Sequence, residues 1–125
     1  MPTVLLVDDE VSIRKALRAF FERAGFTVAE APSAGAALEA LAGNQGLDAV
    51  VIDVLMPEVN GLAFYDSLVA QAPQLAGRVV FLTGAAKDPA VIEPIEQRGV
   101  PILSKLDDFR LVVDAVRVAM LRSPG

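Results

Sequence analysis

The sequence predicts an α/β fold in which five parallel strands alternate with helices. Short apolar runs such as Val50-Val51-Ile52 recur along the chain, and uninterrupted apolar strands are typical of parallel sheets covered by helices on both faces. The stretches between these runs place their apolar residues at helical spacing. We therefore expect a (βα)5 doubly wound sheet with the strand order 2-1-3-4-5, which also satisfies the right-handed crossover rule.

Turn-forming and capping residues separate the elements. We expect strands at residues 3–8, 27–31, 48–53, 78–83 and 100–104. We expect helices at residues 11–24 and 33–41, after Asn60-Gly61 to about Gln71, from Asp88-Pro89 onward, and from Asp107 or Asp108 to about Arg122. Ser33 has the short polar side chain of a helix N-cap. Pro94 removes a backbone donor inside the fourth helix, which should therefore be short or kinked.

Composition limits the possible functions. The 125 residues suffice for one domain, which we expect at residues 1–122 with a tail at 123–125. The chain has no Cys and no His, so disulfides, thiolate metal sites and histidine bases are excluded. A net charge of −5 argues against direct binding to nucleic acid. Apolar runs fall far short of the roughly 18 residues that span a membrane, and a cytoplasmic location is the default expectation.

Chemically useful residues stand where the predicted strands end. Asp8-Asp9 follow the first strand, Asp53 ends the third, Thr83 ends the fourth, and Lys105 follows the fifth. The carboxyl ends of parallel strands meet at one edge of the sheet, and ligands bind where the strand order reverses. In the predicted order this reversal lies between the first and third strands. Three carboxylates, a hydroxyl and an ammonium should therefore share one crevice.

Each of these residues also has a simpler interpretation when taken alone. Asp8, Asp9 and Glu10 could cap the first helix and favour its positive end. Asp53 could be an ordinary strand end, and Lys105 an ordinary exposed cation. The functional interpretation depends on the topology, which places all of them together.

The same residues carry a resemblance to a known family. Five motifs occur in order, each at a strand end: Asp8-Asp9, Asp53, Met56-Pro57 with Gly61, Thr83-Gly84, and Lys105. In this set the chain resembles the receiver domain of two-component response regulators, which has a flavodoxin-like fold. The resemblance implies that a histidine kinase or a histidine phosphotransfer protein donates a phosphoryl group to Asp53, in a reaction that depends on Mg²⁺.

The resemblance also implies roles for the other residues. Asp9 and Asp53 would bind Mg²⁺ directly with the backbone carbonyl of Leu55, and Asp8 would act through water, since Mg²⁺ prefers oxygen ligands and keeps several waters. The Asp53 carboxylate would be the nucleophile, so no general base is required. Thr83 and Lys105 would bind the phosphoryl oxygens and offset their charge.

Three positions depart from the family pattern. Leu106 replaces a proline after the lysine, Ile102 replaces an aromatic residue in the last strand, and Pro94 lies in the fourth helix. These changes predict atypical signalling without an aromatic switch, through the loop after Thr83 and the fourth helix. They also leave open a pseudo-receiver that only binds proteins. A small aspartate-dependent phosphatase is disfavoured because Leu55 stands where such enzymes have a second aspartate.

Two surfaces are candidates for partner contacts. The first helix has a basic polar face, which is either the docking site of the phosphoryl donor or simply solvated: Arg14, Lys15 and Arg18. The last helix has apolar residues off its core-facing stripe, which could form a homodimer or an output contact, or be scattered exposed residues: Leu111, Val118 and Leu121.

Overall fold

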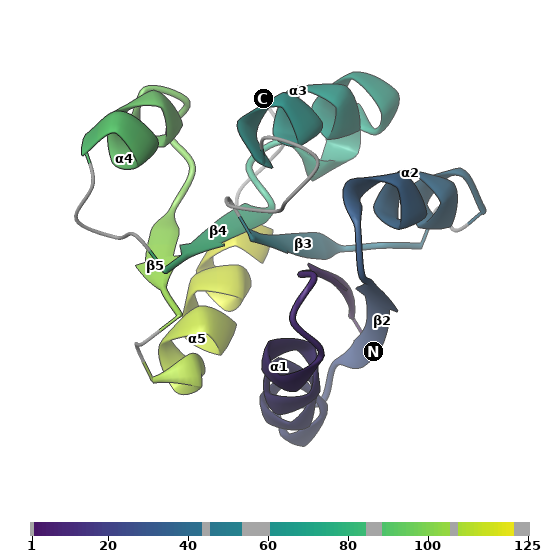
Figure 1. The fold of residues 1–125 in the computed structure, drawn as a ribbon. Helices are drawn as coiled ribbons and strands as arrows, with labels where there is room; N and C mark the ends of the chain where they lie inside the picture. The colour runs from purple at the N-terminus through teal and green to yellow at the C-terminus, as the bar shows by residue number, and fades with distance from the viewer. Residues whose placement is uncertain (1, 44–45, 54–60, 85–88, 106–107, 122–125) are drawn as a thin grey trace.

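The structure is a computed structural model that describes residues 2–43, 46–53, 61–84, 89–105 and 108–121. Its strands are all parallel and form one sheet in the order β2-β1-β3-β4-β5, which confirms the predicted fold class and strand order (Figure 1). The strands are β1 (Thr3–Val7), β2 (Thr27–Ala31), β3 (Ala49–Asp53), β4 (Val79–Thr83) and β5 (Ile102–Ser104). The helices are α1 (Val11–Arg23), α2 (Ala34–Gly43), α3 (Gly61–Gln71), α4 (Pro89–Glu96) and α5 (Phe109–Met120).

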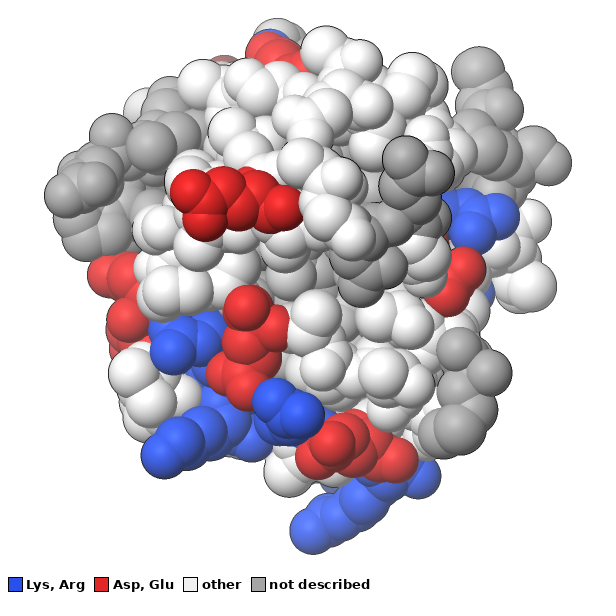
Figure 2. All heavy atoms as spheres, turned by 90° about the vertical axis from the view of Figure 1, so that its right-hand side faces the viewer, with Lys and Arg blue, Asp and Glu red and all other residues white. Residues whose placement is uncertain are grey.

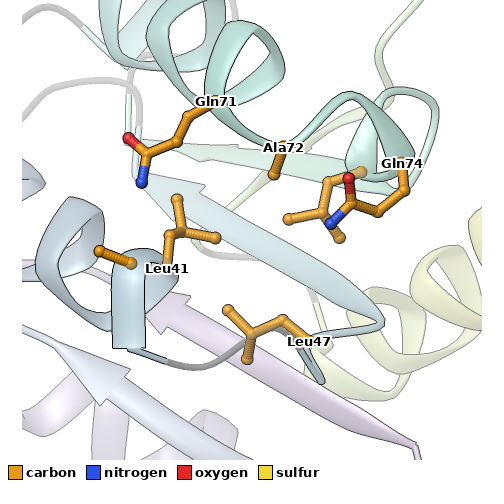
Figure 3. Close-up of a pocket in the computed structure, with 7 residues that line it drawn as sticks. Leu41, Leu47, Gln71, Ala72 and Gln74 are labelled. Atoms are coloured by element: carbon orange, nitrogen blue, oxygen red, sulfur yellow. The ribbon is translucent and has the colours of Figure 1, made fainter.

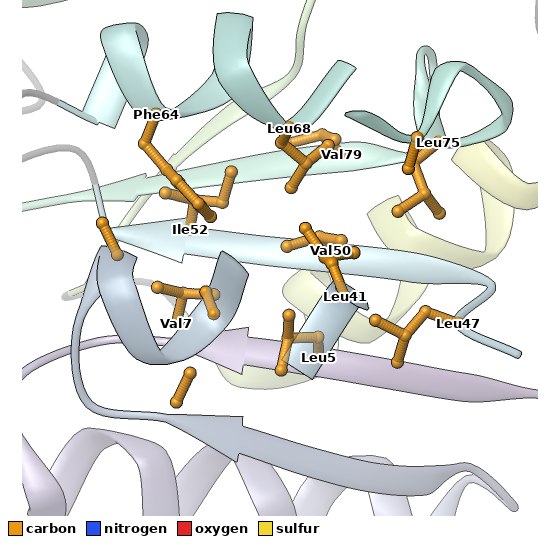
Figure 4. Close-up of a cluster of buried hydrophobic side chains, with 14 of the residues drawn as sticks. Leu5, Val7, Leu41, Leu47, Val50, Ile52, Phe64, Leu68, Leu75 and Val79 are labelled. Carbon is orange, nitrogen blue, oxygen red and sulfur yellow. The ribbon is translucent and has the colours of Figure 1, made fainter. Parts of the chain in front are cut away.

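The core consists of two layers, one on each face of the sheet. Successive strand residues point to opposite faces, so Leu5 and Val7 of β1 join the layer beneath α2 and α3, whose side chains Figure 4 shows. Val4 and Leu6 join the layer beneath α1 and α5. Because both faces are covered, β1, β3 and β4 are almost entirely apolar and buried.

Local capping explains where two of the helices, α2 and α5, begin. Ser33 Oγ accepts a hydrogen bond of 3.1 Å from the Ala36 N–H at the start of α2, as predicted. Asp108 caps α5, because its Oδ1 accepts the Arg110 N–H at 2.9 Å. Pro94 lies inside α4, which is only eight residues long, in agreement with the expected short helix.

Some details differ from the sequence prediction. β1 ends at Val7, so Asp8 lies just beyond the strand, and β5 begins only at Ile102. A short 3-10 helix at Pro73–Leu75, which we did not predict, connects α3 to β4. Several positions used in the sequence prediction lie outside the described residues: Leu55, Met56, Pro57, Asn60, Asp88, Leu106, Asp107, Arg122 and the predicted tail at 123–125. Among the helices that the structure describes, none is both long and apolar enough to cross a bilayer.

Candidate functional site

The register of the sheet brings two buried aspartates together. Val7 of β1 is paired with Ile52 of β3, so the next residues along these neighbouring strands, Asp8 and Asp53, lie side by side at the carboxyl edge. Each is only 2% exposed. This edge is where the strand order reverses, which is the position that open α/β sheets use for ligands.

Lys105, which follows the edge strand β5, completes the site. Its backbone N–H donates to the Thr83 carbonyl oxygen at 3.0 Å, which ties the segment after β5 to the end of β4. Its Nζ lies 2.9 Å from Asp53 Oδ2, 2.7 Å from Glu10 Oε1 and 3.1 Å from Asp8 Oδ2. The lysine therefore reaches the carboxylates, as the strand-end pattern predicted.

Thr83 lies at the same edge of the sheet. It ends β4, is paired with Ser104 of β5, and is 0% exposed. β4 also pairs with β3, where Leu82 is the partner of Asp53. Thr83 is the next residue along β4, so it lies close to Asp53 at the carboxyl edge. The sheet thus brings together the predicted side chains of Asp8, Asp53, Thr83 and Lys105.

Four acidic residues offer a set of oxygen ligands. Asp8, Asp9, Glu10 and Asp53 each present a carboxylate oxygen, and these oxygens all lie within 4.8 Å of one another. Burial, with the negative charge of Asp53, raises the pKa of Asp8 to about 6, although the Glu10 N–H and Lys105 oppose this shift. Crowded carboxylates of this kind favour a hard cation, which would relieve their repulsion.

One oxygen of Asp8 tests whether a cation would fit. Asp8 Oδ2 is buried and has no hydrogen-bond partner among the described residues. Lys105 Nζ lies 3.1 Å away as an ion pair, but not in hydrogen-bonding geometry. A buried carboxylate oxygen without a donor is costly, whereas a divalent cation would satisfy it. The residues present therefore fit a Mg²⁺ site.

Lys105 is held in its protonated, positively charged form in this environment. Burial disfavours the ammonium form, but hydrogen bonds to Glu10, Asp53 and Asp8 outweigh burial and raise the pKa of Lys105 above its ordinary value. The side chain is only 11% exposed. An ammonium held in this way can offset anionic charge on a bound phosphoryl group.

The contacts of Glu10 and Arg14 were not predicted. The Arg14 guanidinium donates to the Asp8 carbonyl oxygen at 2.6 Å and pairs with Glu30 of β2 at 3.1 Å. Arg18 pairs with Glu30 at 2.7 Å. The basic face of α1 is therefore partly neutralised by acidic neighbours, and Figure 2 shows basic and acidic side chains interspersed on this side of the molecule.

Two cavities lie away from the acidic edge. One, of about 340 Å³, is lined by the C-terminal ends of α2 and α3; Figure 3 shows Leu41, Leu47 and Ala72 around it with the amides of Gln71 and Gln74. Another, of about 390 Å³, lies between α1 and α5. None of the residues that line them belongs to the acidic cluster.

A doubly wound α/β domain with buried carboxylates and a lysine at its switch point matches one family. The sequence profile of the response regulator receiver domain matches residues 4–117. The chain is 33% identical over 105 residues to the C4-dicarboxylate transport transcriptional regulatory protein DctD of Rhizobium meliloti. The matched region covers 83% of this chain and 22% of DctD. It is 31% identical over 122 residues to the transcriptional regulatory protein FixJ of Azorhizobium caulinodans, covering 96% of this chain and 56% of FixJ.

Solved structures show the same architecture. A receiver domain protein of Clostridium thermocellum has a TM-score of 0.86 at 25% identity, covering 98% of this chain and 96% of that one. The chemotaxis protein CheY4 of Vibrio cholerae has a TM-score of 0.82 at 24% identity, covering 95% and 98% respectively, and shares the fold.

The profile match covers most of the chain, which belongs to the response regulator receiver domain family. Membership places it in two-component phosphorelays as a signalling domain. The chain spans less than two thirds of the length of these curated relatives, DctD and FixJ.

Proposed function

We propose that this domain works in the cytoplasm as a phosphoacceptor, taking a phosphoryl group from a histidine kinase or a histidine phosphotransfer protein onto Asp53. The observation that carries the proposal is the contact of the Lys105 ammonium, 2.9 Å from the buried Asp53 carboxylate, with Asp8 beside both. A buried aspartate without partners would destabilise the folded protein, because its charge would be removed from water without compensation. Next to a second carboxylate and a lysine, it has what phosphoryl transfer requires of a protein, namely positioning and charge.

Asp9 and Asp53 would hold Mg²⁺ directly, together with the backbone carbonyl of Leu55, which lies outside the described residues. Asp8 would hold it through water. When bound, Mg²⁺ supplies charge neutralisation for the phosphoryl oxygens. Asp8 Oδ2 is buried and accepts no hydrogen bond from the described residues, which supports this assignment.

The residues of the chain perform the rest of the step. A carboxylate oxygen of Asp53 attacks phosphorus, a new P–O bond forms, and the bond from phosphorus to the donor breaks with its electron pair leaving on the donor. The Lys105 ammonium and the Thr83 hydroxyl would bind the phosphoryl oxygens. The domain would thus catalyse its own phosphorylation and dephosphorylation without acting on other substrates.

Labelling with acetyl phosphate and Mg²⁺ tests the proposal. We expect the intact mass to increase by one phosphoryl group in the unaltered chain and not in Asp53→Asn. Asp48→Asn is a matched control, because Asp48 immediately precedes β3, at the end away from Asp53, and accepts the Thr3 N–H at 2.8 Å. Equal labelling of Asp53→Asn would refute the assignment. No labelling of the unaltered chain would instead indicate the non-phosphorylated pseudo-receiver.

The output is proposed to pass through the segment after Thr83 and through α4. Ile102 of β5 is half-buried and packs against the core layer beneath α2 and α3. Because this residue is an isoleucine, β5 has no aromatic side chain at this position to act as a switch. Arg98, which follows α4, instead pairs with Asp66 of α3 at 2.9 Å. Beryllofluoride with Mg²⁺ should shift the amide resonances of Thr83, α4 and Lys105; an equal response in Asp53→Asn would contradict this route.

Two partner surfaces complete the proposal. The start of α1, beside the acidic edge, would receive the phosphoryl donor, and α5 would contact a second copy of the chain. Leu111, Val118 and Leu121 of α5 and its end are 49%, 54% and 85% exposed. Sedimentation at several concentrations should show a dimer that Leu111→Glu abolishes; a monomer at all concentrations would exclude the homodimer.

A further inference from the structure

Glu10 stands between the acidic edge and α1 but does not cap the helix. It occupies the N-cap position of α1 with an extended backbone (φ −86°, ψ 112°), and its side chain makes no capping hydrogen bond. Its backbone N–H donates to Asp8 Oδ1 at 2.9 Å. Its carboxylate instead reaches Lys105, 95 positions away in the sequence, at 2.7 Å.

Glu10 is the partner of Lys105 that the proposed chemistry leaves unused. The lysine ammonium contacts three acidic residues, and two of them, Asp8 and Asp53, are assigned to Mg²⁺ and to the phosphoryl group. The Glu10 contact is the shortest of the three. The Glu10 side chain is 53% exposed, whereas Asp8 and Asp53 are buried, so it can turn with the lysine at little packing cost.

A divalent cation and the ammonium would share the same two carboxylates, Asp8 and Asp53. Two positive charges held by the same pair of carboxylates repel each other in a partly buried site, so a cation at Asp8 and Asp53 would weaken the contacts of Lys105 with them. A displaced ammonium without a carboxylate would be an unpaired charge in a mostly buried position, since Lys105 is 11% exposed. Glu10 already holds it at the exposed side of the cluster.

We propose that Glu10 is a positioning residue that retains the Lys105 ammonium beside the site while a divalent cation takes over Asp8 and Asp53. This inference rests on the proposed function and deepens it: Glu10 acts through Lys105 and is not itself a ligand of the cation. Its carboxylate makes it easier for the lysine to leave the buried aspartates, and it keeps the lysine within reach of the phosphoryl oxygens.

A double-mutant cycle separates this role from direct ligation. Mg²⁺ affinity is measured calorimetrically on the full chain for the unaltered protein, Glu10→Gln, Lys105→Met and the double variant. Glu10→Gln should weaken Mg²⁺ binding about fivefold, which is the scale of a partly exposed ion pair. In the Lys105→Met background the same change should cost less than about twofold, because no lysine remains to be displaced. Glu22→Gln, an exposed carboxylate farther along α1, is the control and should leave affinity unchanged.

A second readout follows the lysine directly. The chain contains only Lys15, Lys87 and Lys105, so selective ¹⁵N labelling of lysine gives a simple ammonium spectrum. With Mg²⁺ bound, the Lys105 ammonium signal should stay protected from solvent exchange in the unaltered chain and be lost in Glu10→Gln.

The outcomes distinguish this inference from the proposed function. An equal loss of affinity in both lysine backgrounds would show that Glu10 binds the cation itself, and unchanged affinity in Glu10→Gln would show that it has no role; either result overturns the inference. Asp53 labelling by acetyl phosphate would be untouched by those results, because it tests the phosphoacceptor separately. Failure of the unaltered chain to bind Mg²⁺ would overturn both.

Discussion

Replacing Asp8 by asparagine should stabilise the metal-free protein. Asp8 is 2% exposed, and its pKa is raised from 3.8 to about 6 by burial and by the neighbouring charge of Asp53. Asparagine has nearly the same shape, keeps an oxygen that can accept the Glu10 N–H, and carries no charge. The substitution therefore removes the cost of the buried charge with little change in packing.

The size and the pH dependence of the effect follow from the raised pKa. A folded-state pKa above the unfolded one means that folding disfavours the charged form, so stability is highest below 3.8 and falls as the pH rises through about 6. A shift of about two units corresponds to roughly 3 kcal/mol, which we take as the upper limit. Near pH 7 the variant should be more stable by up to this amount, and near pH 4 most of the difference should vanish.

Urea unfolding in the presence of a chelator measures this difference. The midpoints of the unaltered chain and of Asp8→Asn are compared near pH 4 and near pH 7, with Asp114→Asn as a control, since Asp114 of α5 is 67% exposed. The control should change stability by less than about 0.5 kcal/mol. With Mg²⁺ present the stability advantage of Asp8→Asn should shrink or change sign, because the variant has lost a group that supports the cation. The reasoning is refuted if the unaltered, metal-free chain is as stable as the variant near pH 7.

Further substitutions test other parts of the fold. Hydrogen bonds from Arg18, and then from Arg14, lower the pKa of Glu30 below 4.5; its stabilisation is present above that value and lost as the pH falls through the folded pKa, so Glu30→Gln should flatten the acid limb of a urea stability profile. Leu68→Ala, at a fully buried position of α3, should lower the free energy of unfolding by about 2–5 kcal/mol in the same assay and leave Mg²⁺ affinity unchanged. Ser33→Ala removes the cap of α2 and should cost about 1 kcal/mol, whereas Ser33→Asp should not.

The strand ends were predictable because they depend on periodicity and topology alone. Apolar runs ending in Asp8, Asp53, Thr83 and Lys105 fix which edge of the sheet each residue occupies, and the structure places these four there. Individual contacts were not predictable in this way. The reach of Glu10 to Lys105 depends on the rotamers of two long side chains and on the distance between the first and last strands, and no sequence pattern encodes either.

The pairing of arginines on α1 shows the same limit. Arg14, Lys15 and Arg18 form a basic face by helical spacing, but β2 brings Glu30 against two of them. Such pairing between elements follows from tertiary structure, so a charge pattern on one helix predicts a surface only when the neighbouring strand is also considered. Donor docking at α1 would then involve Lys15 and the start of the helix more than the arginines.

The acidic edge is a place where folding and function favour different residues. Stability alone would favour a neutral residue in place of at least one buried carboxylate, as the expected effect of Asp8→Asn implies. Proteins commonly retain such destabilising groups at functional sites. Lys105 reduces the cost by pairing with both aspartates, yet the same pairing opposes the entry of a divalent cation. Glu10 offers the lysine a third carboxylate, which resolves this conflict because the ammonium can leave the two aspartates without losing all its partners. The position of Glu10, exposed and in contact with Lys105 but not used as a helix cap, has a physical reason on this account.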